Sequence, residues 1–307
     1  MNRIPVILDV DTGLDDALAI LLAADSLELE LLGIACVGGN VPVDHTYANT
    51  KYISKLLGLK IPIAKGAANP LASKVLHAHE VHGSGGLGRV KIEPEYEKHV
   101  LAASALSVPL VSGATEPVTI ISTGPVTTLA HKSQNHPDLH PKIKQISFMG
   151  GSLGEGNVTR YAEFNAHFDP EALNVVLRSK IPLIMAGFQL TTTIRIDHPD
   201  LLPAITDPNP AQAFYLDLLD FYIDNSKKRG FALGGALHDS IAVAAVALPS
   251  MFQSELKSVI INISKDERRG ETHEEGELDN VSVLMDADKN KLIQRTVESI
   301  RHLGKTE

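Results

Sequence analysis

Short apolar runs of strand length alternate along the chain with longer helical patterns. Ile4–Leu8 is a β-branched run typical of a buried strand, and Asp15–Ala24 follows with apolar residues on most faces, which is typical of a buried helix. We predict further strands at Leu29–Val37, Ile61–Ala64, Val118–Ser122, Lys144–Met149, Leu183–Met185, Ser258–Ile263 and Val281–Met285. We predict further helices at Asp44–Leu57, Pro125–Lys132, Pro170–Arg178, Ala211–Asn225, Asp239–Ala247 and Lys289–His302.

This alternation predicts an α/β fold with a mostly parallel central sheet flanked by helices. No internal repeat and no low-complexity linker interrupts it, so we predict a single domain over residues 1–307. Two segments break the pattern. Lys65–Pro94 is rich in Gly, His and Ala, which predicts a long functional loop, and Lys265–Glu277 is charge-rich, which predicts a solvated loop. In such sheets ligands bind beyond the carboxyl ends of the strands.

Four carboxylates occupy eight positions at the end of the first predicted strand. Asp9 and Asp11 alternate along the strand, which predicts a shared face, whereas Asp15 and Asp16 fall in the first turn of the helix after Gly13. A single Asp there would need no explanation beyond the positive end of the helix. Four like charges after a buried strand are unfavourable unless a cation neutralises them, and oxygen ligands of this kind favour Ca²⁺ or Mg²⁺ over zinc.

Three further groups of polar residues follow predicted strands or open predicted helices. Taken alone, each has an ordinary interpretation as a turn, a helix start or a capped loop. The groups are Gly39-Asn40, then Ser122-Thr123-Gly124-Pro125, and then Gly156-Asn157 with Ala162-Glu163-Phe164-Asn165 and Asp169-Pro170-Glu171-Ala172. A fourth group, His238-Asp239, opens the apolar helix near residue 240.

Together these motifs resemble the inosine–uridine-preferring nucleoside hydrolases, whose N-terminal signature D-x-D-x-x-x-D-D is complete here. The resemblance runs from Arg3 to at least Leu248 and is looser over Val281–Leu303; the family usually has Pro where this chain has Thr12. It implies the nucleoside hydrolase fold with a Rossmann-like core. It also implies hydrolysis of the N-glycosidic bond of ribonucleosides to ribose and free base, through an oxocarbenium-like transition state.

The resemblance also implies roles for individual residues. Asp11 is the expected general base, and His238 is the first candidate for the acid that protonates the departing base. The expected Ca²⁺ ligands are Asp11, Asp16, Asp239 and the carbonyl of Thr123. The expected substrate-binding residues are Asp15, Asn40, His82, Asn157, Glu163, Phe164 and Asn165. His82 precedes a segment with four glycines between residues 83 and 88, which we expect to close as a lid.

Base preference is less sharply indicated. Some members of the family place a tyrosine about twelve residues before the active-site histidine, to meet the base. Here that position is Ser226, and Tyr222 lies one helical turn earlier. The chain has no tryptophan, which removes the strongest stacking side chain. We therefore predict a pyrimidine or mixed preference.

The composition and charge of the chain argue against some classes of binding partner. A formal net charge of −9 argues against nucleic acid and against an anionic membrane surface. The expected partner, a small-molecule ribonucleoside, is what the family resemblance implies. The lone Cys36 cannot form an internal disulfide, no signal-peptide pattern is visible, and no apolar stretch approaches the roughly 20 residues that span a bilayer. We predict a cytoplasmic protein, and the resemblance implies a homodimer or homotetramer.

Two other functions fit part of the sequence. A haloacid-dehalogenase-type phosphatase has the motif D-x-D-x-T after a strand, which Asp9–Thr12 matches, with Asp9 as nucleophile and Mg²⁺ as metal. That hypothesis leaves Asp15, Glu163 and His238 unexplained and lacks a later strand ending in paired acids. A non-catalytic nucleoside-binding protein is the second, although every expected catalytic group is present.

Overall fold

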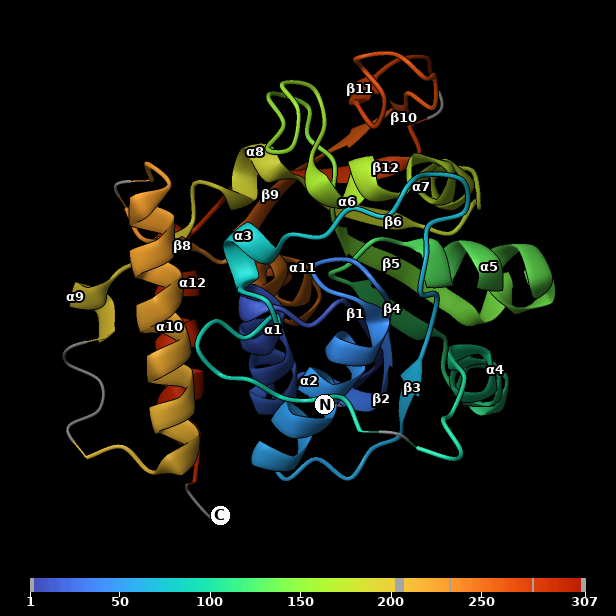
Figure 1. The fold of residues 1–307 in the computed structure, drawn as a ribbon. Helices are drawn as coiled ribbons and strands as arrows, with labels where there is room; N and C mark the ends of the chain where they lie inside the picture. Colours follow the sequence, from blue (N-terminus) through green and yellow to red (C-terminus); the bar gives the residue numbers. More distant parts are fainter. Residues whose placement is uncertain (1–2, 96, 202–206, 232, 278, 305–307) are drawn as a thin grey trace.

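An eight-stranded sheet forms the centre of the molecule (Figure 1). The structure, a computed structural model, describes residues 3–95, 97–201, 207–231, 233–277 and 279–304. The strand order is β3-β2-β1-β4-β5-β6-β12-β9, and every neighbouring pair is parallel except β12 and β9. The strands are β1 (Ile4–Val10), β2 (Leu29–Cys36), β3 (Ile63–Lys65), β4 (Val118–Ser122), β5 (Ile143–Met149), β6 (Leu183–Ala186), β9 (Phe252–Lys257) and β12 (Val281–Ala287).

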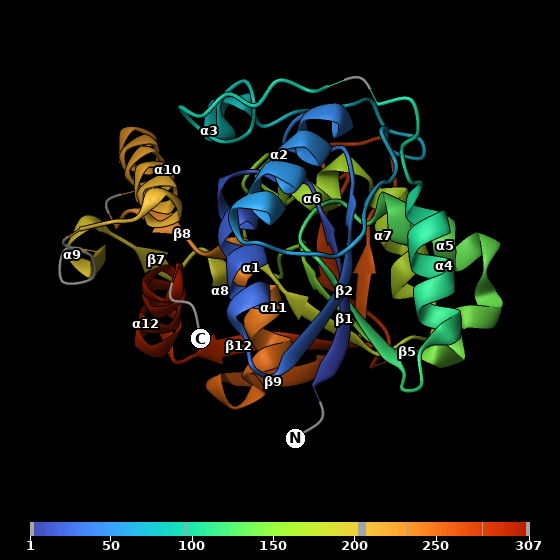
Figure 2. The same cartoon turned by 90° about the horizontal axis from the view of Figure 1, so that it is seen from below.

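Helices cover both faces of this sheet (Figure 2). One hydrophobic cluster joins the sheet to α1 (Leu14–Asp25), α2 (Val43–Leu56), α10 (Pro210–Lys228), α11 (His238–Ala247) and α12 (Lys289–His302). A second cluster, on the opposite face, involves α4 (Ala103–Gly113), α5 (Thr127–Asn135) and α7 (Pro170–Leu177). The predicted fold class is therefore confirmed. Among the described helices, none is long and apolar enough to cross a membrane.

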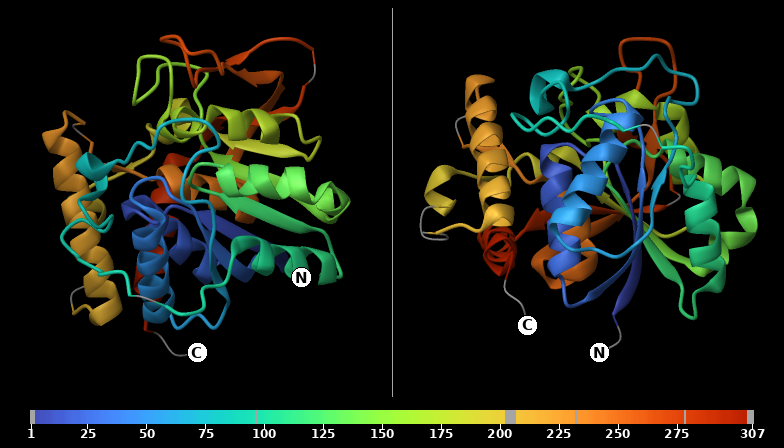
Figure 3. Two further views of the ribbon diagram at one scale, coloured as in Figure 1. Left: turned by 45° about the vertical axis from the view of Figure 1, so that its right-hand side comes forward. Right: turned by 60° about the horizontal axis from the view of Figure 1, so that its bottom comes forward.

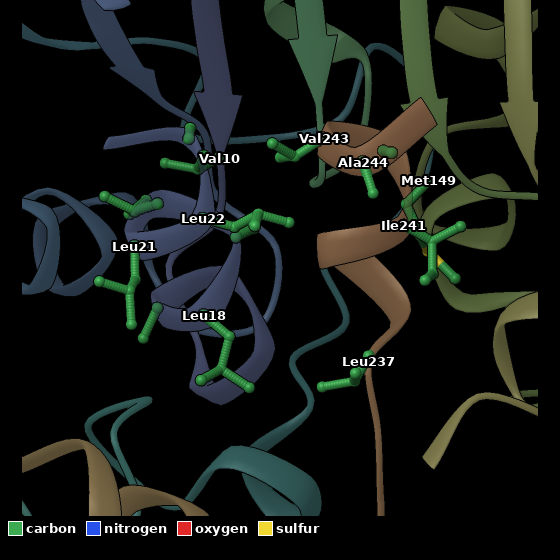
Figure 4. Packing of buried hydrophobic residues seen from close by; sticks show 14 of the residues in the cluster. Val10, Leu18, Leu21, Leu22, Met149, Leu237, Ile241, Val243 and Ala244 are labelled. Atoms are coloured by element: carbon green, nitrogen blue, oxygen red, sulfur yellow. The ribbon is translucent and has the colours of Figure 1, made fainter. Parts of the chain in front are cut away.

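Helices α1 and α11 form the centre of the first cluster (Figure 4). Leu18 and Leu22 of α1 face Ile241 and Val243 of α11, and all four are at least 97% buried. A helix that is apolar on nearly every face, as α11 is, must be buried on all sides. This packing brings the first turns of the two helices, and therefore their polar residues, to the same edge of the sheet.

The sheet has its topological switch point at β1. The chain passes from β1 to β2 on one side, whereas β4 pairs with β1 on the other side, with Asp9 opposite Ser122. The loops that leave β1 and β4 consequently diverge and leave a crevice beyond the carboxyl ends of these strands. Both the carboxylate motif and Thr123 follow these two strand ends.

Most predicted elements are present to within a few residues, and the differences lie at the edges of the fold. The predicted strand Ser258–Ile263 is not part of the main sheet, because β10 (Val259–Ile261) pairs only with β11 (Thr272–Glu274) in a separate hairpin (Figure 3). The predicted loop Lys265–Glu277 contains β11, so that prediction was partly wrong: Thr272 is buried and bonds Ser152.

Several elements were not predicted. Strand β9 is mostly exposed at the sheet edge, and α4 contains Pro109, so neither shows the usual hydrophobic periodicity. The predicted loop Lys65–Pro94 contains the single-turn helix α3 (His79–His82). The remaining short elements are α6 (Phe164–Phe168), α8 (Phe188–Thr191), β7 (Arg195–Ile196), α9 (His198–Leu201), β8 (Gly235–Ala236) and the 3₁₀ turns Pro137–Lys142 and Pro249–Met251.

Candidate active site

A cavity of about 330 Å³ opens at the switch point. Its lining brings together nearly all of the residues predicted from sequence, namely Asp11, Asp15, Asn40, His82, Thr123, Asn157, Glu163, Phe164, Asn165, His238 and Asp239. Asp16 is fully buried beside them. We name Asp11, Asp15, Asp16 and Asp239 the carboxylate end, and Arg195, Asn225, Ser226, Arg229 and Phe231 the guanidinium end.

Hydrogen bonds fix the carboxylate end to the strand ends. The backbone N–H of Gly13 and the hydroxyl of Thr123 donate to the two oxygens of Asp16, at 2.8 and 2.7 Å. The backbone N–H of Asn40 donates to Asp11 Oδ2 at 2.7 Å, and its side-chain amide reaches Asp16 Oδ2 at 3.3 Å. Asn40 was predicted to bind ribose; in this structure its backbone N–H also holds the Asp11 carboxylate, and its side-chain amide that of Asp16.

Three of the carboxylates have the spacing of a metal site. Asp15, Asp16 and Asp239 are buried, and each offers an oxygen within 4.8 Å of the others. Burial, with Asp16 adjacent, raises the pKa of Asp15 to about 7, and burial together with Asp15 and Asp16 raises the pKa of Asp239 well above its usual value. Asp15 Oδ1 has no hydrogen-bond partner in the described chain. A cation would remove this repulsion, so the cluster could hold a metal ion.

The carbonyl of Thr123 points into the same region. It accepts a hydrogen bond of 2.7 Å from the side-chain amide of Asn165, which also donates to the Met149 carbonyl at 3.1 Å. A carbonyl oxygen has two lone pairs, so this bond leaves one for a further partner. The roles of Thr123 as a metal ligand and of Asn165 as a substrate ligand stay predictions.

Glu163 is held by backbone groups at the start of α6. Its two oxygens accept from the N–H groups of Gly151, Asn165 and Ala166, at 2.8, 2.9 and 3.1 Å. Asn157 Oδ1 accepts from the N–H of Phe164 at 2.8 Å. The predicted sugar-binding residues therefore also position one another, which fixes their side chains before any ligand binds.

His82 packs on the first turn of α1. The N–H of Leu14 donates to His82 Nδ1 at 3.1 Å, so the ring proton lies on Nε2. Burial lowers the pKa of His82 to about 3, which keeps the imidazole neutral. Helix α3 is tied to α10 because the Asn225 side chain donates to the carbonyls of Glu80 and Val81. The predicted lid movement is not tested by these contacts.

His238 opens α11 and lies between two neighbours from α8. Its Nδ1 is 2.8 Å from the Thr191 hydroxyl, and its ring stacks on Phe188 with centroids 5.5 Å apart. Burial, with a contribution from Arg195, lowers the pKa of His238 to about 3. Its role as an acid for the departing base stays a prediction.

The guanidinium end was not predicted as a unit. Arg195 lies on β7 and donates to Ser226 Oγ at 3.2 Å, and the Tyr222 hydroxyl donates to the Ala236 carbonyl at 2.9 Å. Both Ser226 and Tyr222 line the cavity, as their predicted proximity to the base requires, although the Tyr222 hydroxyl is already bonded. A charged residue between Ile194 and Ile196 was the only local signal for Arg195.

Asp9 lies outside the cavity lining. It is 1% exposed, and burial raises its pKa to about 8, with Lys132 opposing that rise. Strand β1 ends at Val10, so the strand alternation that predicted a common face for Asp9 and Asp11 does not continue to Asp11. A phosphatase nucleophile must be reached by substrate, and the cavity lining includes Asp11 but not Asp9.

Comparison with known proteins agrees with this geometry. Residues 6–294 match the family model described as inosine-uridine preferring nucleoside hydrolase. The chain is 36% identical to the pyrimidine-specific ribonucleoside hydrolase RihA of Escherichia coli K12 and 35% identical to that of Citrobacter koseri, each alignment covering 97% of this chain and 98% of the relative. The purine-preferring ribonucleoside hydrolase from Gardnerella vaginalis superposes with a TM-score of 0.88 at 28% identity, over 97% of this chain and 98% of that one. The chain therefore belongs to the family of inosine-uridine preferring nucleoside hydrolases.

Proposed function

We propose that this protein hydrolyses ribonucleosides to ribose and free base with a pyrimidine or mixed preference, using a bound Ca²⁺. One observation carries the proposal. A single cavity at the switch point gathers Asp11, a cluster of buried carboxylates and the Asn157–Asn165 segment, all in the order and context that the family's chemistry requires. The relatives from Escherichia coli and Citrobacter koseri are pyrimidine-specific ribonucleoside hydrolases, which supports the base preference.

In this mechanism the protein holds the ribose and moves one proton. Asp15, Asn157, Glu163 and Asn165 bond the sugar hydroxyls, and fixed polar groups of this kind reject a sugar that lacks a hydroxyl. Asp11 accepts the proton of the attacking water as the water oxygen bonds C1′. The C1′–N bond breaks early, and the sugar passes through an oxocarbenium-like transition state that the fixed ribose contacts stabilise.

Asp11, Asp16, Asp239 and the Thr123 carbonyl would hold the Ca²⁺. The donor set consists of oxygen atoms alone, which suits Ca²⁺ rather than zinc. When bound, the ion would lower the pKa of a water molecule and so favour its attack at neutral pH. The carboxylates with oxygens within 4.8 Å of one another are those of Asp15, Asp16 and Asp239, so Asp15 can serve the metal, the sugar or both. Location in the cytoplasm and assembly as a homodimer or homotetramer also stay predictions.

The direct test is phosphate-free hydrolysis by the purified protein. Uridine, cytidine, inosine and adenosine are incubated with the wild type in the presence of Ca²⁺, and released reducing sugar is measured. Asp11→Asn preserves the shape of the side chain, and we expect it to lower kcat by about 100- to 10,000-fold, the range of general base catalysis. Asp44→Asn is the matched control, because Asp44 is an exposed aspartate that bonds Lys65 away from the cavity.

The outcomes separate the rival functions. Sugar release that persists in Asp44→Asn and is lost in Asp11→Asn supports hydrolysis. Nucleoside binding without sugar release supports a binding protein. Cleavage of p-nitrophenyl phosphate with Mg²⁺, and no sugar release, supports the phosphatase.

A further inference from the structure

A fixed guanidinium lies in the part of the cavity that the ribose contacts leave free. Arg195 is anchored through its backbone, because β7 pairs with β8 in antiparallel register, Arg195 opposite Ala236. The adjacent carbonyl of Ile194 accepts from the N–H of Leu237 at 2.9 Å. This pairing fixes the strand that carries Arg195 against the residues that lead into His238, and both Arg195 and His238 line the cavity.

The side chain of Arg195 is also fixed. Nε donates to the Thr192 carbonyl at 2.8 Å, Nη1 donates to Ser226 Oγ and the Gly234 carbonyl at 3.2 and 2.6 Å, and Nη2 donates to Thr192 Oγ1 at 3.2 Å. Phe231 covers one face of the guanidinium, with Cζ 4.3 Å from the ring centroid. Four of the five N–H groups therefore have partners among the described residues, and one Nη2 N–H is left for a ligand.

We propose that Arg195 recognises bases with an oxo group at the edge remote from the sugar, such as uracil and hypoxanthine, and stabilises them as they leave. This inference rests on the proposed function and deepens it. Guanidinium only donates hydrogen bonds, so it pairs with a carbonyl oxygen and opposes the amino group that cytosine or adenine carries at the equivalent position. A charge-assisted bond strengthens as its acceptor gains negative charge.

The atoms and charges of the hydrolysis step balance without a protonated histidine. Water oxygen bonds C1′, the C1′–N bond breaks, and its electron pair stays on the base, whose oxo groups share the negative charge beside Arg195. The proton that Asp11 takes from water returns to solvent, from which the departing base takes one.

Two other charged residues, Arg229 and Glu80, line the cavity, and both are exposed. The backbone carbonyl of Glu80 accepts a hydrogen bond from the Asn225 side chain. Neither has the multiple side-chain anchors of Arg195.

The test compares Arg195→Met and Arg195→Lys with the wild type on two substrate pairs, uridine with cytidine and inosine with adenosine. For Arg195→Met we expect kcat/KM to fall by about 10- to 100-fold on uridine and inosine, the value of one charge-assisted hydrogen bond, and much less on cytidine and adenosine. Lysine keeps the positive charge but lacks the planar guanidinium group, so kcat/KM of Arg195→Lys on uridine and inosine should fall less than that of Arg195→Met. p-Nitrophenyl riboside, whose leaving group needs no stabilisation, should be cleaved by all three at similar rates.

Arg89→Met is the matched control. Arg89 also lies over an aromatic ring of α10, with Cζ 5.6 Å from the Phe221 centroid, and does not line the cavity. Equal losses on all four nucleosides and on the nitrophenyl riboside would show that Arg195 is only structural and would overturn the inference, as would unchanged substrate ratios. If the wild type cleaves no nucleoside, the proposed function fails. In that case, the binding of uracil and of cytosine to the wild type and to Arg195→Met is measured by calorimetry. This comparison decides whether Arg195 selects the oxo group.

Discussion

The two ends of the cavity are built in opposite ways. At the carboxylate end, Asp11, Asp15 and Asp16 follow one another at a strand end and a helix start, and backbone N–H groups bond their oxygens. At the guanidinium end, Arg195 and Ser226 come from separate elements, and the Arg195 side chain donates to carbonyls and hydroxyls. Three of the four carboxylates at the first end belong to one local segment, and α11 adds Asp239, whereas the second end exists only after β7, β8 and α10 have assembled.

The electrostatic balance of the two ends differs as well. At the first end, burial and then repulsion between neighbouring carboxylates raise the pKa values of Asp11, Asp15 and Asp239. At the second end, the Arg195 guanidinium is surrounded by carbonyls, hydroxyls and an aromatic face, which stabilise its charge. The comparison indicates that chemistry and sugar binding depend on one end and choice of base on the other, and this separation can be tested.

Metal removal should give the largest difference between the two ends. After exhaustive dialysis against a chelator, we expect nucleoside hydrolysis to fall by at least about 100-fold, because a catalytic metal contributes several kcal/mol. The melting temperature should also fall, because the carboxylates at Asp15, Asp16 and Asp239 then repel without compensation. Binding of free uracil, measured by calorimetry, should be nearly unchanged. Added Ca²⁺ should restore both activity and melting temperature. Full activity in a sample shown to be metal-free contradicts the assignment.

Gly39→Ala should disturb only the carboxylate end, and its effect on activity should be smaller than that of metal removal. A Cβ at this position would lie 2.1 Å from Asp11 Oδ2, so the general base must move. We expect kcat to fall at least about tenfold and the protein to lose about 1–3 kcal/mol of stability, as overpacked sites do. Gly113→Ala at the end of α4 meets nothing within 4 Å and should leave kcat unchanged, with equal or slightly higher stability. Unaltered kcat in Gly39→Ala would show that the position of Asp11 is not critical.

Phe231→Ala should give the smallest effect, at the guanidinium end. Removing the ring from the face of Arg195 takes away a cation–π contact worth about 0.5–1 kcal/mol, so the uridine-to-cytidine ratio of kcat/KM should fall by about two- to fivefold. Thermal stability should barely change, because Phe231 is 40% exposed. Phe221→Ala removes the ring under Arg89 outside the cavity and should leave the ratio unchanged. A larger effect from Phe221→Ala than from Phe231→Ala would argue against the separation of the two ends.

Most strands of the central sheet could be predicted from the sequence, whereas β9 at its edge could not. Buried strands such as Val118–Ser122 are short runs rich in β-branched residues and bounded by turns, so their length and type are local properties. The exposed edge strand β9 carries no such pattern, because only its pairing with β12 makes it a strand. For the same reason β10 was recognised as a strand but its pairing with β11 was not predicted: the partner of a strand is not a property of its own residues.

The sequence by itself determined the carboxylate end, the order of its motifs and the family to which the chain belongs. It could do so because strand ends and helix starts place consecutive residues at the edge of a parallel sheet. Only the tertiary structure decided that Asp9 is buried away from the cavity while Asp11 lines it, and that Arg195 meets Ser226 and Phe231. These outcomes depend on where a strand ends and on how distant segments pair. Both are set by the free energy of the whole fold, and local sequence patterns do not encode them.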